Sequence, residues 1–166
     1  MIDKAQRFYT LFVQAVSSLQ SPFLLAVRLY WGWQFIQTGI GHITHLDKVT
    51  AYFGDLGIPA PALNAPLISM LELGGGILLA LGLASRPIAF LLTCNMMVAF
   101  ITADREALFS VFSNPDKLYA AAPYTFLFAC LLVMIFGPGK LAIDTLIAKR
   151  LGDQSPLINK EPLLHL

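Results

Sequence analysis

A single carboxylate, Glu72, stands near the middle of the long apolar run LISMLELGGGILLALGLASR, residues 67–86. A helix of about 20 apolar residues is long enough to cross the roughly 30 Å hydrocarbon core of a bilayer. A charged carboxylate at that depth is unfavourable by several kcal/mol unless it finds a partner or takes up a proton. The sequence therefore predicts a sheltered polar point inside a membrane protein.

Other polar side chains could share this interior. At 1.5 Å per helical residue, Glu72, Gln34 and Tyr124 fall in one layer, about 18 Å from the ends of their expected spans. Asn95 falls at about 12 Å and Arg28 at about 9 Å, so an ion pair between Arg28 and Glu72 is not required. We interpret these five residues as candidate substrate-binding residues. A purely structural hydrogen bond is an equally good interpretation of Glu72, and snorkelling to the interface is the simpler account of Arg28.

Small residues are expected to bring the helices together. Gly32 and Gly39 fall in one stripe about 80° wide with Arg28, Phe35 and His42, and this stripe should face the bundle because its polar members are unfavourable against lipid. In the second run no strand precedes the glycines, which favours helix packing over phosphate binding. The predicted packing glycines are Gly32, Gly39, Gly75 and Gly76.

Two histidines lie near the end of the first run. His42 and His45 could bind a metal or the head group of a quinone, but without acidic neighbours in sequence they are more often ordinary interface residues. The cysteines, Cys94 and Cys130, lie far apart in apolar runs, outside any CxxC pair, and are expected to be packing residues. We predict no metal site.

Composition places the chain in the membrane class. Hydrophobic residues make up 57% of the sequence, charged residues 13%, and mean hydropathy is +0.69, whereas soluble domains have about 25% charged residues. The net charge is +1 without a basic block, which excludes an electrostatic surface for nucleic acid. The sequence has no haem-ligand pair, iron–sulfur cysteines, nucleotide fingerprint or dithiol, so we expect no redox cofactor in the chain itself.

These patterns predict an all-α integral membrane protein, an antiparallel four-helix transmembrane bundle with amphipathic interfacial helices. Residues 1–20 read as an amphipathic helix lying on the membrane or packing against a partner subunit. Residues 21–139 form the transmembrane domain, with spans at about 23–43, 63–84, 87–104 and 118–136. Residues 140–151 read as a basic surface helix and 152–166 as a flexible tail. Short interfacial helices are expected within 44–62 and 107–117.

The distribution of basic residues favours one orientation. With both termini in the cytoplasm, that side holds Lys4, Arg7, Arg86, Lys140, Lys149, Arg150 and Lys160. The other side holds only Lys48, Arg105 and Lys117. The positive-inside rule therefore predicts cytoplasmic termini.

Several pieces of sequence, in this order, resemble the DoxX family of small four-span prokaryotic membrane proteins over about residues 25–151. They are Arg28 with the Gly32, Phe35, Gly39 spacing, then YFGDLGIPAP, ELGGGILLALGLASR and GPGKLAID. Where the family usually has Lys shortly after the second glycine, this chain has His42. The family is similar to a subunit of archaeal thiosulfate:quinone oxidoreductase and to the membrane component of a mycobacterial oxidoreductase assembly. The resemblance implies a protein of the prokaryotic cytoplasmic membrane that partners redox proteins.

Two classes of function follow. In the first, the chain is a membrane subunit of an oxidoreductase system and binds a quinone or another small molecule near Glu72. In the second, it is a non-catalytic accessory or scaffolding subunit that docks on a larger membrane complex through its glycine faces and surface helices. Both imply membrane lipids and other membrane or redox subunits as partners, and no nucleic acid. A transporter is a weaker third interpretation, because a bundle of four spans would need to oligomerise to pass a solute.

Overall fold

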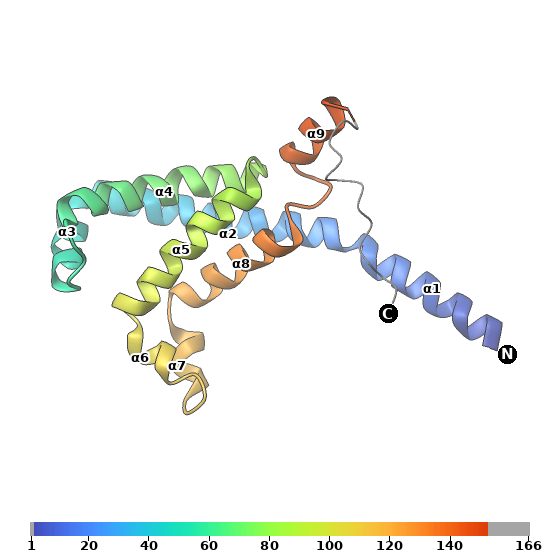
Figure 1. Cartoon of the computed structure of the whole chain (residues 1–166), viewed down its shortest axis with the longest axis horizontal. Helices are drawn as coiled ribbons and strands as arrows, with labels where there is room; N and C mark the ends of the chain where they lie inside the picture. The colour runs from blue at the N-terminus through green and yellow to red at the C-terminus, as the bar shows by residue number, and fades with distance from the viewer. Residues whose placement is uncertain (1, 153–166) are drawn as a thin grey trace.

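The computed structural model describes residues 2–152, and every regular element in that range is a helix (Figure 1). The predicted all-α fold is confirmed. The helices are α1 Ile2–Ser18, α2 Gln20–Thr44, α3 Leu46–Asp55, α4 Pro61–Leu81, α5 Ser85–Thr102, α6 Arg105–Phe109, α7 Pro115–Ala120, α8 Pro123–Phe136 and α9 Ile143–Arg150. All but the first residue of the predicted tail, 152–166, lies outside the described residues.

Within that range, 3 stretches of helix are long and apolar enough to cross a bilayer. They are Lys4–Thr44, which joins α1 to α2, then α4 and α5. The fourth apolar helix, α8, has 14 residues. This is the arrangement of a small helical membrane bundle, packed together as the sequence predicts.

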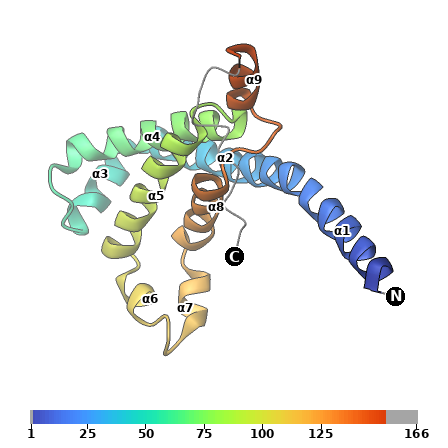
Figure 2. The same ribbon diagram turned by 45° about the vertical axis from the view of Figure 1, so that its right-hand side comes forward.

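The first helix pair is α2 with α4, which run antiparallel along each other (Figures 1 and 2). Their backbones touch at glycines: a Cβ atom on Gly39 would lie 2.5 Å from the Leu73 nitrogen, and one on Gly76 would lie 2.7 Å from the Gly32 carbonyl oxygen. No larger side chain fits at these points. The stripe of α2 that carries Gly32 and Gly39 therefore faces α4, and the two helices are locked in one register.

The second pair is α5 with α8, which cross the first pair at a slant (Figure 2). The main core lies between the two pairs. Its fully buried members include Leu79 of α4, Leu92 of α5, and Ala129, Cys130 and Val133 of α8. Cys130 is thus the packing residue that the sequence predicts.

The fourth span is not one continuous helix, contrary to the predicted span 118–136. The helix breaks between α7 and α8, where Ala121 is extended with φ −66° and ψ 129°. Pro123 begins α8, and a proline lacks the N–H that an uninterrupted helix would need there. The break leaves Ala121 and Ala122 as a short connection inside the apolar part of the chain.

The N-terminal helix is less separate than the sequence suggests. Pro22 lies in the first turn of α2, where proline is tolerated, and the Phe23 N–H donates to the Leu19 carbonyl, so α1 runs on into α2 with a bend at Leu19. In both views α1 extends away from the bundle (Figures 1 and 2). Its apolar side chains Phe8 and Phe12 are exposed.

The α6 and α7 helices form a small projection between α5 and α8 (Figure 1). The Lys117 ammonium donates to the Glu106 carboxylate, and this contact lowers the pKa of Glu106. Both groups are exposed, so the pair orients the two short helices more than it stabilises the fold.

Candidate functional site

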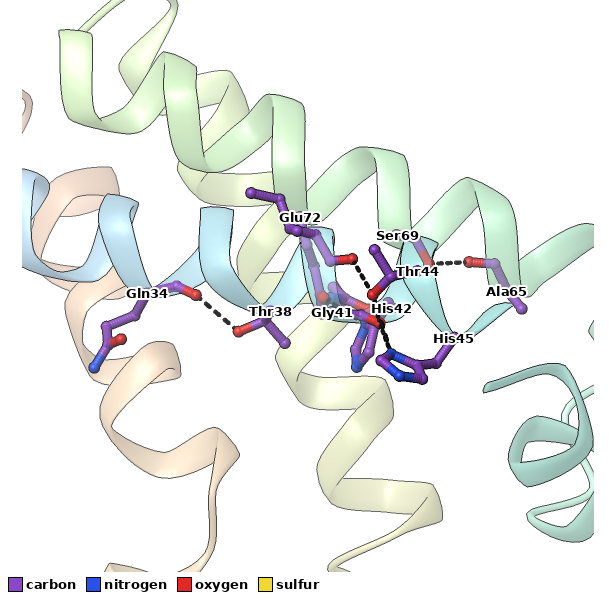
Figure 3. A network of polar contacts seen from close by, with 11 residues as sticks. Gln34, Thr38, Gly41, His42, Thr44, His45, Ala65, Ser69 and Glu72 are labelled. Carbon is purple, nitrogen blue, oxygen red and sulfur yellow. Dashed lines mark hydrogen bonds and ion pairs between the residues drawn. The ribbon is translucent and has the colours of Figure 1, made fainter. Parts of the chain in front are cut away.

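Glu72 is buried, with 4% of its surface exposed, at the point where α2, α4 and α5 meet. The Asn95 side-chain amide donates to Glu72 Oε1 at 3.0 Å. His42 Nδ1 lies 2.9 Å from Oε2, at ion-pair distance but off the hydrogen-bond axis. Figure 3 shows Glu72 and His42 close together between α4 and α2. The three residues form the polar cluster that we call the Glu72 cluster.

The turn between α4 and α5 explains why Asn95 reaches Glu72. Helix α4 ends at Leu81 and α5 begins at Ser85. Glu72 therefore lies about 14 Å from its end of this turn and Asn95 about 15 Å from the other end. The sequence estimate had placed Asn95 lower, because it counted from Ala84 and Pro87 rather than from the helix ends.

The register of α2 on α4 explains why His42 is the third member. Gly39 packs against Leu73, so the polar residue beside Glu72 is the one nearly a turn beyond Gly39. That residue is His42, and Gln34 lies more than two turns before it. Gln34 instead points its amide toward the Tyr30 hydroxyl, at 3.4 Å.

Tyr124, the third member of the predicted layer, also lies elsewhere. Its ring packs on Tyr119, with centroids 5.3 Å apart, and it borders a small core of Phe100, Ala107 and Ala121 near α6 and α7. The break before α8 places Tyr124 only one residue into that helix. The predicted layer of Glu72, Gln34 and Tyr124 is therefore not a contact cluster; of the five candidates, the structure brings together Glu72 and Asn95.

Arg28 belongs to a second polar cluster at the opposite end of α2, about 21 Å from His42. It is 0% exposed, and its Nη2 donates to the Leu141 carbonyl at 2.5 Å. Its guanidinium packs directly on Gly82, where a Cβ atom would overlap it. Snorkelling is therefore the wrong account of Arg28: the chain after α8 folds over it and holds it.

Asp144 completes the second cluster. Its carboxylate accepts the Ala84 and Ser85 N–H groups, each at 2.8 Å, and its own N–H donates to Gly82. These two N–H groups lie at the start of α5, where a helix offers them no carbonyl partner. Asp144 therefore caps α5 from a distant part of the chain. This contact ties α9 to the turn between α4 and α5.

A pocket of about 840 Å³ opens beside the Glu72 cluster. Its wall is mostly apolar and comes from α2, α3, α4, α5 and the start of α8, with Phe35, Leu71 and Phe126 among its members. Glu72, His42 and Asn95 all line it. Ligand sites in proteins are commonly apolar cavities of this size with a few polar groups that fix orientation.

Helix α3 forms one side of the pocket. Val49, Tyr52, Phe53 and Leu56 all line it. In the sequence these residues repeat at helical spacing, within the segment 44–62 where a short interfacial helix is expected. A single amphipathic helix gives no indication of whether its apolar face meets lipid or a neighbouring helix, so the pattern predicted α3 but not its role.

The chemistry open to the Glu72 cluster is hydrogen bonding and proton exchange. Glu72 offers an acid, His42 a base, and Asn95 a fixed donor and acceptor. Within residues 2–152, no group of three His, Cys, Asp or Glu side chains could hold a metal ion.

Comparison with known proteins gives a consistent picture. The DoxX family profile matches residues 23–105, which include the whole Glu72 cluster. The inner membrane protein YqjF of Escherichia coli is 29% identical over 81% of this chain and 99% of its own length. CatD of Bacillus subtilis, whose name provisionally describes an oxidoreductase, is 27% identical over 75% of this chain and 87% of its own. A Mycobacterium tuberculosis membrane protein, Rv3486, is 27% identical over 78% and 83%. No solved structure gives a significant match.

Proposed function

The chain belongs to the DoxX family, and from this membership we propose that it is a membrane subunit of an oxidoreductase system that binds a quinone or a similar lipid-soluble molecule beside Glu72. Its place would be the prokaryotic cytoplasmic membrane, with both termini in the cytoplasm. The name of CatD supports the oxidoreductase part of the proposal, and the names of YqjF and Rv3486 support the membrane.

The observation that carries the proposal is the polar cluster set in the wall of an otherwise apolar pocket. A quinone has an apolar body and carbonyl groups that accept hydrogen bonds, and its reduced form has hydroxyl groups that donate them. His42 and Asn95 offer donors for the carbonyl groups, and Glu72 offers an acceptor for a hydroxyl group. The remaining wall matches the apolar body.

The proposed function requires a redox partner protein. Side chains such as Glu, His and Asn exchange protons but do not carry electrons, so the electrons would pass between the bound molecule and a partner protein that holds a redox cofactor. The partner would approach from within the membrane or from its surface. The role of this chain would be to bind the molecule and orient its polar end.

Direct binding tests this proposal. We expect the purified protein in lipid nanodiscs to bind a tritiated short-chain quinone, and Asn95→Leu to weaken binding about tenfold, the equivalent of one hydrogen bond of about 1.4 kcal/mol. Gln34→Leu is the matched control, because this amide lies in the same bundle but outside the pocket lining. The proposal fails if the wild-type protein does not bind the quinone, or if both substitutions weaken binding equally.

The second candidate, an accessory or scaffolding subunit, is favoured by helix α1. This helix extends from the bundle with exposed apolar side chains, among them Phe8, Leu11, Phe12 and Val16. In that case substitution of Phe8 and Phe12 by Ser would abolish the cellular activity of the complex, and pocket substitutions would leave it intact. The opposite result favours the quinone site.

A further inference from the structure

His42 stands between the buried Glu72 carboxylate and the outside of the bundle. Its side chain is 33% exposed, whereas that of Glu72 is 5% exposed. His42 lies only about 3 Å along the axis from the last residue of α2, Thr44, and helix α3 begins directly beyond it. The imidazole is therefore the member of the cluster nearest to the membrane face that carries α3.

We propose that Glu72 and His42 form a proton-exchange site that holds one proton between them and equilibrates with the face of the membrane that carries α3. The proton occupancy of this pair then sets which form of a ligand the pocket accepts. Only this last clause rests on the proposed function; the proton site itself stands on the geometry of the two side chains.

Electrostatics explains why the pair holds a single proton. With one proton, the pair is either an imidazolium with a carboxylate or an imidazole with a carboxylic acid, and both forms are neutral overall. Loss of this proton or gain of a second leaves a net charge, which is disfavoured at the buried carboxylate but is eased by the partly exposed His42 ring, so the pair can still exchange its proton as the pH changes. A small rotation of the ring brings Nδ1–H onto Glu72 Oε2; transfer then breaks that N–H bond and forms an O–H bond with no change in total charge.

The other titratable groups around the pocket leave this balance intact. Helix α3 contributes Lys48 and Tyr52, the middle of α5 contributes Cys94, and Asp104 lies just before α6. Lys48 and Asp104 carry opposite charges. From α8 and its start, only Ala122, Pro123 and Phe126 line the pocket, and none of these titrates. On α4, Glu72 is the sole titratable residue among those that line it.

Asn95 fixes which oxygen takes part. Its amide donates to Oε1, so Oε1 is occupied and Oε2 faces His42. With the proton on Oε2, the carboxyl group can donate to a ligand carbonyl. With the proton on His42, the carboxylate can accept from a ligand hydroxyl. A quinone and its reduced form would therefore favour different positions of the same proton.

The first test needs no ligand. Infrared difference spectra of the protein in nanodiscs, recorded between about pH 5 and 8, should show a carboxyl band that disappears in Glu72→Gln. In His42→Gln the pH at which this band reaches half its intensity, its midpoint, should shift by about one pH unit or more, because the carboxylate loses its basic partner. A midpoint unchanged by His42→Gln would overturn the proposal.

His45→Gln is the matched control. His45 lies on the next turn of the chain, is exposed, contacts the Gly41 carbonyl and Thr44, and does not line the pocket. It should leave the midpoint where it is in the wild-type protein. If His45→Gln moves the midpoint as far as His42→Gln, the effect is a general surface charge effect and the specific pair is refuted.

The second test identifies the face of the membrane. The protein is reconstituted in liposomes in one orientation, and the pH is stepped on one face at a time. The carboxyl band should follow the pH on the face that carries α3. A band that follows the face that carries the chain termini would overturn the proposal.

His42→Lys is a second variant, which keeps the proposal testable if His42→Gln does not fold. Lysine keeps a cation beside Glu72, so the carboxylate should stay ionised and the pH-dependent band should vanish while thermal stability is retained. A persistent titrating band in a folded His42→Lys protein would contradict the inference. Because these measurements use no quinone, a failure of quinone binding sinks the proposed function alone, and a silent carboxylate sinks the proton site alone.

Discussion

Three consecutive glycines on α4 have three different environments. A Cβ atom on Gly74 would meet nothing within 4 Å, one on Gly75 would touch the tip of Leu92 at 3.2 Å, and one on Gly76 would meet the backbone of Gly32 at 2.7 Å. A flexible side-chain tip can move aside, whereas the backbone of a packed helix cannot. Glycine is therefore needed at position 76 for contact with α2, whereas it is dispensable at position 74.

A series of alanine substitutions checks this difference. Gly76→Ala should lower the free energy of unfolding by about 1–3 kcal/mol through overpacking. Gly74→Ala should leave it unchanged or raise it by about 0.5–1 kcal/mol, because alanine favours a helix more than glycine does. Gly75→Ala should fall between them. Thermal unfolding in one detergent gives the ranking, and equal effects at Gly74 and Gly76 would contradict the packing described for α2 and α4.

Asn95 allows a second prediction at this scale. Asn95→Leu removes the donor to Glu72 Oε1 and leaves a buried oxygen without a partner, at a cost of about 1–3 kcal/mol in the free energy of unfolding. Equilibrium unfolding followed by circular dichroism measures the loss. Gln34→Leu should be close to neutral, because its amide bonds an exposed hydroxyl group. A larger loss for Gln34→Leu would show that the buried carboxylate does not depend on Asn95.

Residue types predicted part of the Glu72 cluster. A lone acid in an apolar run pointed to Glu72, and the polar residue in the next run pointed to Asn95. The stripe of α2 that contains His42 was also visible, but nothing in the sequence sets how far α2 slides along α4. Contact of the glycines sets it, and this contact brings His42 rather than Gln34 to Glu72.

At the scale of elements, the start of α5 depends on a residue from the far end of the chain. Ala84 has a left-handed backbone with φ 48°, and Asp144 accepts the N–H groups of Ala84 and Ser85. Such a contact between distant segments leaves no periodic pattern in the sequence. Local spacing predicted the helices well for this reason and the ties between them poorly.

Asp144→Ala should therefore act on α5 rather than on its own helix. Loss of the cap should reduce the free energy of unfolding by about 0.5–2 kcal/mol and speed hydrogen exchange at the Ala84 and Ser85 amides. Asp144→Asn keeps one acceptor and should have a smaller effect. Asp116→Ala, an exposed acid in the first turn of α7, is the control. Faster exchange confined to α9 would contradict the capping role.

The positions of the helices followed from apolar runs and from Pro and Gly boundaries. The break before α8 was missed because Pro123 lies inside an otherwise continuous apolar run, where its effect on the preceding residues decides the path of the chain. The contact of α3 with the pocket could not be read from the sequence, because lipid and a neighbouring helix are equally apolar partners. The first of these concerns the continuity of a helix, and the second concerns a tertiary contact.

For the whole molecule, the predicted four spans with cytoplasmic termini give a testable expectation about sidedness. A reporter fused after Leu166 should report the cytoplasm, and one inserted between α6 and α7, at residues 111–113, should report the opposite side. Alkaline phosphatase, which is active only outside the cytoplasm, and green fluorescent protein give complementary readouts. Reporters at both positions that indicate the same side would contradict the four-span topology.

The short fourth helix has a consequence for the surrounding lipid. At 1.5 Å per residue, the 14 residues of α8 extend about 21 Å, less than the roughly 30 Å of hydrocarbon in a typical bilayer. Acyl chains that border α8 must shorten or tilt to meet it, which is hydrophobic mismatch confined to one flank of the protein. Ala122 and Pro123, at the start of α8, also line the pocket, so the thinner flank of the protein is the flank that borders the pocket. The lipid beside this pocket should therefore respond to bilayer thickness more than the lipid beside the longer helices.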